Sequence, residues 1–104
     1  MSMAYTKMHG AGNTFVLVDD QAEQFESQNG VLIRAMCDTG SGIGSDGLLL
    51  MQRSDCADVR MRFFNPDASE VAMCGNGARC LARFAVEAGL AKEALRIETG
   101  AGVL

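Results

Sequence analysis

The sequence has little of the chemistry on which metal and disulfide sites depend. Its 104 residues include a single histidine, and its four cysteines form no Cys-x-x-Cys pair, so we expect no metal site. The cysteines also lack the dense, regular spacing of a disulfide scaffold. Free thiols of this kind are typical of a reducing compartment, so we expect a cytoplasmic protein.

Other shortages exclude whole classes of partner. Acidic residues outnumber basic ones by 13 to 9, and with a net charge of −4 no basic stripe is left to neutralise phosphates, so nucleic acid is not expected as a partner. No run approaches the roughly 20 apolar residues of a membrane span, and residues 1–7 have no apolar core of signal-peptide length. The 48% apolar composition is enough for the core of one soluble domain.

The apolar patterns predict a strand-rich fold with two helices. Residues 48–52 form a short apolar run typical of a buried strand, and residues 58–65 alternate, with two arginines on the side opposite Val59, Met61 and Phe63. Further strands are predicted at residues 5–8, 14–19, 69–73 and 95–99, the last with a partner strand starting at residue 103. A short helix is predicted over residues 29–37, with Ser27 as its cap and an apolar side made of Val31, Leu32, Ala35 and Met36.

The second helix, predicted over residues 77–89, is apolar around most of its circumference. Only Arg79, Arg83 and Glu87 form a charged stripe, at four-residue spacing. A helix that is apolar nearly all round is usually buried, so we expect a sheet to wrap around it. The alternative is a helix lying on one sheet face, with Arg79 and Arg83 in solvent.

The most informative motif is MCGNGARC at residues 73–80. Cys74 ends a strand-like segment, and two glycines and an asparagine then lead into the helix. The thiol should therefore lie beside the free N–H groups of a helix N-terminus, where the helix dipole stabilises a thiolate. The same N–H groups can hold a carboxylate, which suits chemistry at the carbon next to a carboxylate. A buried, inert cysteine before an ordinary helix is the alternative.

Three stretches together resemble the N-terminal half of diaminopimelate epimerase. They are KMHGAGNTFV at residues 7–16, GIGSDGLL at 42–49, and FFNPDASEV at 63–71 running into CGNGARC at 74–80. The resemblance extends from about residue 5 to residue 104. It implies an α+β fold in which a twisted mixed sheet curls around a central buried helix, repeated in two pseudo-symmetric domains. Residues 1–104 would be the N-terminal domain, with the C-terminal domain absent from this chain.

The resemblance also implies an isomerase that uses neither pyridoxal phosphate nor a metal, and so no cofactor. In that family two cysteines face each other across the α-carbon of the substrate; one thiolate removes the α-proton and the other thiol delivers a proton to the opposite face. By similarity, Cys74 is the first of this pair. Gly75 and Asn76 would bind the substrate carboxylate through backbone N–H groups, and Asn13 and Asn65 would hydrogen-bond its far end. The reaction converts LL-diaminopimelate to the meso form, a precursor of lysine and of bacterial cell wall.

The sequence departs from the family pattern in several places. Thr14 stands where aspartate is usual, and Gly47 stands where some members carry a glutamine that contacts substrate. The family's second catalytic cysteine lies in the second half, and no remaining cysteine here has a comparable turn-to-helix setting; Cys80 falls in the same helix as Cys74. We therefore expect one domain of a two-domain enzyme, inactive alone. Its exposed interface would favour association, of which a homodimer is one form.

Other functions stay open. A related racemase of the same fold, such as the proline racemase type, is one, although proline racemases place histidine at the position of Asn76. A non-catalytic folded fragment is another. The glycine-rich residues 39–44 suggest a nucleotide-binding loop, but they lack the Gly-Lys-Ser/Thr of a P-loop and lead into a strand.

Several candidate side chains also have local explanations. Asparagine is common in turns, which is where Asn13 and Asn65 fall. His9 could order its own turn as readily as act in a site. Asp46 and Asp67 are interpreted as solvated turn residues, because no matching metal-ligand spacing accompanies them.

Overall fold

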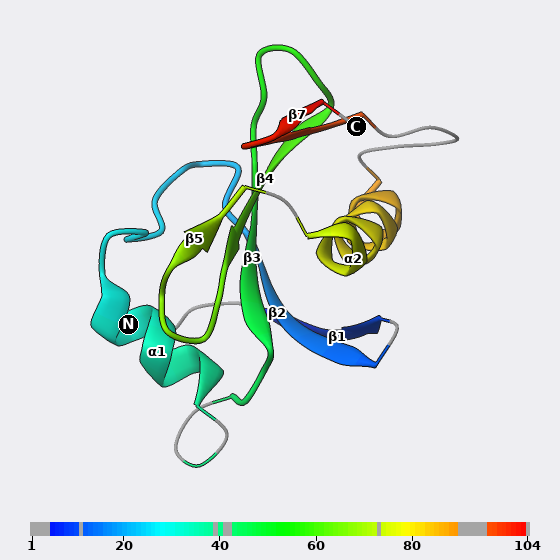
Figure 1. Cartoon of the computed structure of the whole chain (residues 1–104). Helices are drawn as coiled ribbons and strands as arrows, with labels where there is room; N and C mark the ends of the chain where they lie inside the picture. Colours follow the sequence, from blue (N-terminus) through cyan, green and yellow to red (C-terminus); the bar gives the residue numbers. More distant parts are fainter. Residues whose placement is uncertain are drawn as a thin grey trace.

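The computed structural model describes residues 5–10, 12–38, 40, 43–72, 74–89 and 96–103. They form one mixed sheet with a helix on either face (Figure 1). The elements are β1 (Thr6–Gly10), β2 (Asn13–Asp19), α1 (Gly30–Cys37), β3 (Gly47–Gln52), β4 (Val59–Phe64), β5 (Glu70–Val71), α2 (Gly75–Glu87), β6 (Ile97–Thr99) and β7 (Gly102–Val103). The predicted α+β class is confirmed. Met73, the last residue of one predicted strand, and Leu95, the first residue of another, lie outside the described residues.

The sheet order places the start of α2 beside the middle of the sheet. The strands follow the order β1-β2-β3-β4-β6-β7, and β5 pairs with β4 off this path. The β2–β3 and β4–β6 pairs are parallel and the others antiparallel. In β4, Phe63 pairs with Val71 of β5, whereas Val59 pairs with Ile97 of β6. The chain thus leaves β5 partway along β4 and enters α2 there.

Strand alternation divides the buried residues into two cores, one under each helix. Phe15, Leu17, Leu49 and Met51 belong to the core under α2. The residues that alternate with them along β2 and β3 point to the opposite face, toward α1. The core on that face comprises Val16, Val18, Ile33, Met36, Cys37, Leu48, Leu50 and Phe64. Every residue of β3 is buried, because both faces of this strand are covered. The short apolar run in the sequence therefore is the buried strand that its pattern predicted.

Helix α1 begins later than its predicted cap. Its N-cap is Asn29, whose side chain accepts a hydrogen bond from the Leu32 N–H at 3.1 Å. The prediction of Ser27 as cap is wrong, because the Ser27 hydroxyl accepts a hydrogen bond from the Arg62 guanidinium at 3.0 Å instead. The predicted apolar side is also displaced: Val31 is 69% exposed, and the buried residues are Ile33, Met36 and Cys37.

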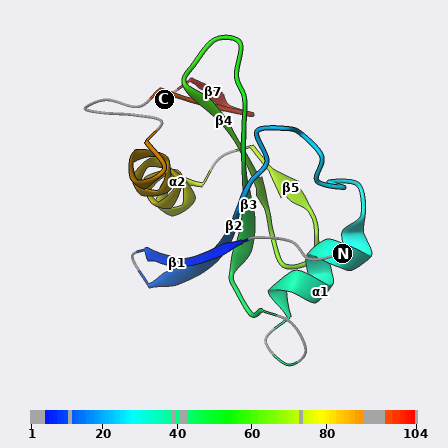
Figure 2. The same cartoon turned by 180° about the vertical axis from the view of Figure 1, so that it is seen from behind.

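Helix α2 is covered on one side. Gly77, Ala78, Cys80, Leu81 and Ala85 are buried, whereas Arg79, Arg83, Val86 and Glu87 are exposed. Strands β1 to β4 all contact the helix, so the sheet curls along its inner side (Figures 1 and 2). Within the described residues the helix lies on one sheet face, as in the alternative interpretation, and is not enclosed all round. Neither helix in this part of the chain is long and apolar enough to cross a membrane.

Candidate active site

Cys74 stands immediately before the first residue of α2. Its backbone is extended, with φ −143° and ψ 112°, and it is the N-cap of the helix; its carbonyl accepts the Ala78 N–H at 2.9 Å. The side chain makes no capping hydrogen bond. It is half-buried and packs against the edge of the α2-side core. The structure thus places the thiol at the start of the helix, as the motif predicted, with the sulfur not used as a cap.

The N–H groups next to this thiol have no acceptor within the helix. The first N–H groups of any α-helix lack a carbonyl one turn earlier, and here they belong to Gly75, Asn76 and Gly77. A Cβ added at Gly75 would meet nothing within 4 Å, so this side is open. One added at Gly77 would lie 3.0 Å from Leu49 Cδ2 and 3.5 Å from Cys74 Sγ. Gly77 therefore lets the helix rest on β3, and Gly75 leaves room for a ligand at the exposed N–H groups.

Asn13 lies on the same face of the sheet as Cys74. It is the first residue of β2, opposite Gly10, and follows a turn in which Gly12 has φ +89°. Alternation along β2 points Asn13 toward the side of Phe15, which belongs to the core under α2. The side chain is half-buried, and among the described residues it has no hydrogen-bond partner. Its amide is thus available to a ligand on the α2 side.

Asn65 is held in its own turn. Its Nδ2 donates to Ser69 Oγ at 3.1 Å, and its backbone N–H donates to the Ser69 carbonyl at 2.9 Å. The same turn contains Ala68, at φ +74°, which packs against the α1-side core. Among the described residues, no hydrogen bond joins Asn65 to Asn13 or to Cys74. The local explanation of this asparagine therefore has direct support, while its Oδ1 is left to accept another donor.

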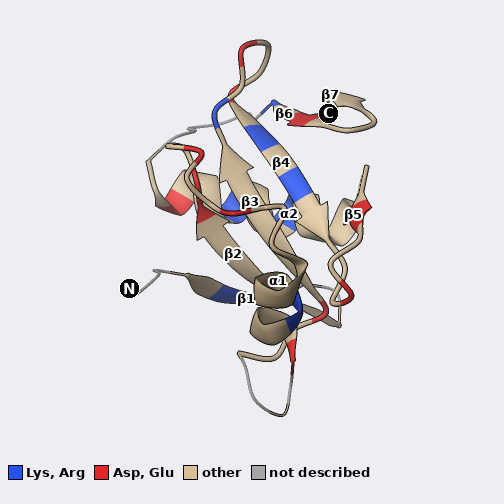
Figure 3. Cartoon of the chain, turned by 90° about the vertical axis from the view of Figure 1, so that its left-hand side faces the viewer, with Lys and Arg blue, Asp and Glu red and all other residues tan. Residues whose placement is uncertain are grey.

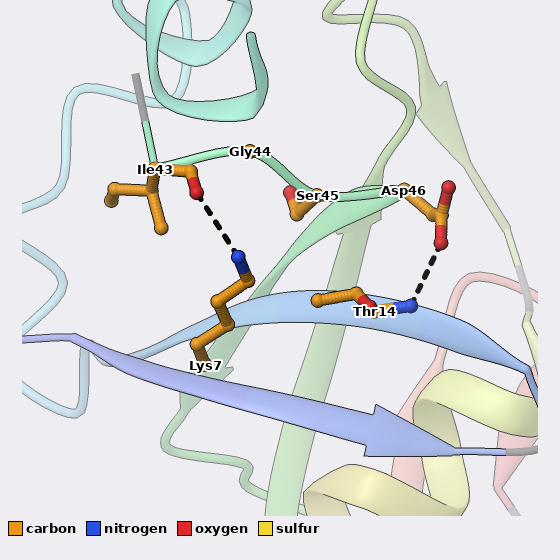
Figure 4. A pocket seen from close by; sticks show the side chains of 6 residues that line it. All are labelled: Lys7, Thr14, Ile43, Gly44, Ser45 and Asp46. Carbon is orange, nitrogen blue, oxygen red and sulfur yellow. Dashed lines mark hydrogen bonds between the residues drawn. The ribbon is translucent and has the colours of Figure 1, made fainter. Parts of the chain in front are cut away.

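A polar cavity of about 290 Å³ lies beside β2, on the side of the loop before β3 (Figure 4). Lys7 donates from Nζ to the Ile43 carbonyl at 3.2 Å. Asp46 accepts the Thr14 N–H at 2.8 Å and donates its own N–H to the Thr14 carbonyl at 2.7 Å. Asp46 therefore is not merely solvated: it holds the residue that follows Asn13. Sequence analysis missed this role because the two residues are 32 positions apart.

The turn before Asn13 is fixed by two more contacts. His9 Nδ1 lies 3.0 Å from Thr14 Oγ1 across the β1–β2 pair, which agrees with an ordering role for this histidine. On the other side, Arg83 of α2 donates from Nη2 to the His9 carbonyl at 3.0 Å. His9, just before the β1–β2 turn, is thus bonded both to the neighbouring strand and to the helix that Cys74 begins.

The other three cysteines lie away from the open side of Cys74. Cys37 is buried under α1, and burial raises the pKa of its thiol, with a hydrogen bond from Ser45 opposing that shift. Cys80 is buried in α2 itself, and burial raises its pKa, opposed by the charge of Arg83. Cys56 is exposed in the β3–β4 loop. None of these thiols can face Cys74 across a substrate molecule.

Comparison with known families finds one match that spans almost the whole chain. The family model for diaminopimelate epimerase matches residues 5–104. The diaminopimelate epimerase of Archaeoglobus fulgidus is 52% identical over 106 residues, which cover 100% of this chain and 38% of that protein. The chain spans 36–38% of the length of the curated relatives that it matches.

Solved structures share the fold. A phenazine biosynthesis protein of the PhzF family from Bacillus anthracis superposes with a TM-score of 0.69 at 28% identity, over 98% of this chain and 33% of that one. A hydroxyproline epimerase from Agrobacterium vitis has a TM-score of 0.70 at 17% identity, over 97% of this chain and 35% of that one. With this shared fold, and with a family match over all but the first four residues, the chain belongs to the diaminopimelate epimerase family.

Proposed function

We propose that the protein is a diaminopimelate epimerase that interconverts the LL and meso forms without a cofactor. The observation that carries this proposal is the position of Cys74: a thiol at the N-cap of α2, beside three N–H groups that the helix leaves free and next to the open space at Gly75. A base and an anion-binding group within one turn of each other are what abstraction of a proton α to a carboxylate requires.

In this mechanism the substrate carboxylate lies on the N–H groups of Gly75 and Asn76. The Cys74 thiolate removes the α-proton, and the electron pair left on the α-carbon delocalises into the carboxylate. Backbone donors fixed at the start of a helix stabilise that developing charge without having to reorganise. A second thiol on the opposite face then gives its proton to the α-carbon, which inverts the configuration. Cys74 ends as the thiol and its partner as the thiolate, ready for the reverse reaction.

The far end of the substrate is proposed to bind Asn13 and Asn65. Diaminopimelate carries a second amino acid group there, which offers both donors and an anion. Among the described residues the Asn13 amide has no hydrogen-bond partner, and Asn65 keeps Oδ1 as an acceptor while Nδ2 stays bonded to Ser69. Binding energy from this non-reacting end would help to hold the α-carbon in line with the thiol.

The second thiol is proposed to come from outside residues 1–104. Cys37 and Cys80 are buried and Cys56 is remote, so none supplies it. We propose a second domain of similar fold whose cysteine faces Cys74 and which covers the outer side of α2, where Val86 is 50% exposed. The helix would then be central, between two pseudo-symmetric halves. A cytoplasmic location and assembly as a homodimer are part of the same proposal.

The test follows LL-diaminopimelate by NMR in D₂O with the full-length gene product. We expect loss of the α-proton signal together with appearance of the meso isomer. Cys74→Ala should abolish both. Cys56→Ala, the same substitution at an exposed cysteine remote from the site, should leave both unchanged. The same assay with proline in place of diaminopimelate tests the alternative that the protein is a racemase of the proline racemase type. No reaction of diaminopimelate, or activity that survives in Cys74→Ala, would refute the proposal.

Residues 1–104 expressed alone test the two-thiol argument. With one thiol at the site, this domain should at most exchange the α-proton for deuterium with retention of configuration. Full inversion by the isolated domain as a monomer would contradict the requirement for a second thiol from outside these residues.

A further inference from the structure

The bond between Arg83 and His9 connects two parts of the proposed site that are far apart in sequence. Arg83 lies on the exposed stripe of α2, nine residues after Cys74, and donates to the backbone carbonyl of His9, 74 positions away, at 3.0 Å. His9 pairs with Thr14 across the β1–β2 turn, and Asn13 is the neighbour of Thr14. Two views show β1 and β2 passing along the same helix (Figures 1 and 2).

This bond adds a directional contact to the packing between α2 and the β1–β2 pair. Among the described residues, it is the one hydrogen bond between α2 and the β1–β2 pair. Both elements also contribute side chains to the α2-side core, among them Ala78 and Leu81 of the helix and Met8 and Phe15 of the strands. Packing limits how far the two can separate, and a guanidinium on a carbonyl adds a directional constraint on the position of β1 along the helix.

We propose that Arg83 is a positioning residue, which fixes the turn that carries Asn13 relative to Cys74. An α-helix is a rigid rod, and nine residues separate Cys74 from Arg83 by about 13 Å along its axis. Cys74 at one end and the His9 contact near the other therefore belong to one rigid body. The inference rests on the proposed function, in which Cys74 is the base and Asn13 binds the far end of the substrate. In this proposal the Arg83–His9 contact sets the distance between these two groups.

Two other contacts beside the turn connect strands to one another and do not involve the helix. The His9–Thr14 contact joins β1 to β2, and the Asp46–Thr14 pair joins β2 to the start of β3. Both keep the turn in its shape. Neither makes a hydrogen bond to α2, so among the described residues the Arg83 bond is the direct polar link between the helix and the β1–β2 pair. Loss of the Arg83 bond should thus move the turn while its internal contacts persist.

Three variants separate this role from general destabilisation. Arg83→Met removes every donor but keeps the unbranched apolar stem that packs along the helix. Arg83→Lys keeps the charge and one flexible donor, without the planar fork of the guanidinium. Arg53→Met is the matched control: its side chain is 74% exposed, just beyond the end of β3 that is remote from Asn13.

The first readout is amide hydrogen exchange in the full-length gene product, which does not depend on activity. Arg83→Met should speed exchange in residues 6–18 while the amides of β3 and β4 stay as in the wild type. In Arg83→Lys the exchange rates of residues 6–18 should lie between those of Arg83→Met and of the wild type. In Arg53→Met they should match the wild type. Unchanged exchange in residues 6–18 of Arg83→Met would overturn the proposal.

The second readout is the kinetics with LL-diaminopimelate. Because small misplacements of binding groups cost large factors in rate, we expect kcat/KM to fall about tenfold in Arg83→Met, with a lower kcat as well as a higher KM, and to recover partly in Arg83→Lys. An equal fall in Arg53→Met, or no fall in Arg83→Met, would overturn the positioning role. A wild-type protein without epimerase activity would instead refute the proposed function, and hydrogen exchange would still decide whether Arg83 holds the turn.

Discussion

The ring of Phe63 lies over Gly47 on the neighbouring strand. A Cβ added at Gly47 would come within 2.7 Å of Phe63 Cζ and 3.0 Å of the Phe64 carbonyl oxygen. The same ring packs edge-on against Phe15, with 5.9 Å between ring centroids and an interplanar angle of 77°. The position at which some family members carry glutamine is therefore covered by an aromatic ring here, and the α2-side core extends to the start of β3.

Gly47→Ala should consequently destabilise the protein. The new methyl group would displace an aromatic ring packed on three strands, and overpacking of this kind costs about 1–3 kcal/mol. Urea unfolding followed by circular dichroism would measure the loss. Gly75→Ala is the matched control, because its Cβ meets nothing within 4 Å. Equal stability of Gly47→Ala and the wild type would mean that the ring moves aside without cost.

Sequence patterns predicted the elements that depend on local periodicity. The apolar run of β3 predicts a strand buried on both faces, the alternation of β4 predicts that Val59, Met61 and Phe63 are buried, and the structure agrees with both. The cap of α1 could not be chosen in this way, since Ser27 and Asn29 are equally good capping residues. What decides between them is Arg62, which binds Ser27 from a strand 35 positions away. The coverage of α2 likewise depends on which strands lie beside it.

The residues of the candidate site also differ in whether the local sequence could predict their roles. Cys74, Gly75 and Asn76 are consecutive, so their placement at a helix start could be read from the motif. The roles of Asp46 and Arg83 depend on backbone groups 32 and 74 positions away, and no local pattern reports such partners. Asp46 was interpreted as a solvated turn residue, and for Arg83 a position in solvent was the alternative to a buried helix.

Asp46 should matter through the acceptor that it offers to Thr14. Asp46→Ala leaves the Thr14 N–H without that partner, and we expect a loss of about 1 kcal/mol, because water can reach this exposed position. Asp46→Asn retains an oxygen that can accept the same bond, so it should recover most of the stability. Thermal unfolding of both variants gives the comparison. Equal losses in the two would point to the charge, not the hydrogen bond.

The pair formed by Arg62 and Glu70 predicts a modest acid sensitivity. The two side chains are joined by hydrogen bonds of 2.9 and 2.8 Å, and β4 presents Arg62 on the α1 side of the sheet, which Figure 3 views. The hydrogen bond from Arg62 lowers the pKa of Glu70 below its ordinary 4.5. The stabilisation is therefore complete above about pH 4.5 and is lost as the pH falls through the lowered pKa.

Because the pair is partly exposed, we expect it to contribute less than about 1 kcal/mol. Glu70→Gln should be slightly less stable than the wild type at pH 7, and the difference should be smaller at pH 3. Glu26→Gln, at an exposed loop residue, is the control and should follow the wild type at both values. Urea unfolding at the two pH values gives the measurement. If the stability difference between Glu70→Gln and the wild type grew at the lower pH, the ionised Glu70 carboxylate would not be the stabilising form.

The four cysteines should react with iodoacetamide in an order that burial dictates. Cys37 and Cys80 are buried and their pKa values are raised by burial, so neither offers an accessible thiolate. Cys56 is exposed and Cys74 is half-buried beside open space, so these two should be labelled first in the native full-length gene product. Mass spectrometry of the digested protein would give the four rates.

Substrate then separates the two reactive thiols. If diaminopimelate binds over Cys74, as proposed, saturating substrate should slow the labelling of Cys74 at least severalfold and leave Cys56 unchanged, because Cys56 lies in the β3–β4 loop. Labelling in urea supplies the reference in which all four thiols are exposed. Equal protection of both thiols would indicate global stabilisation by the ligand. Protection of Cys56 alone would place the ligand at the other end of the sheet, and the assignment of Cys74 to the site would then be wrong.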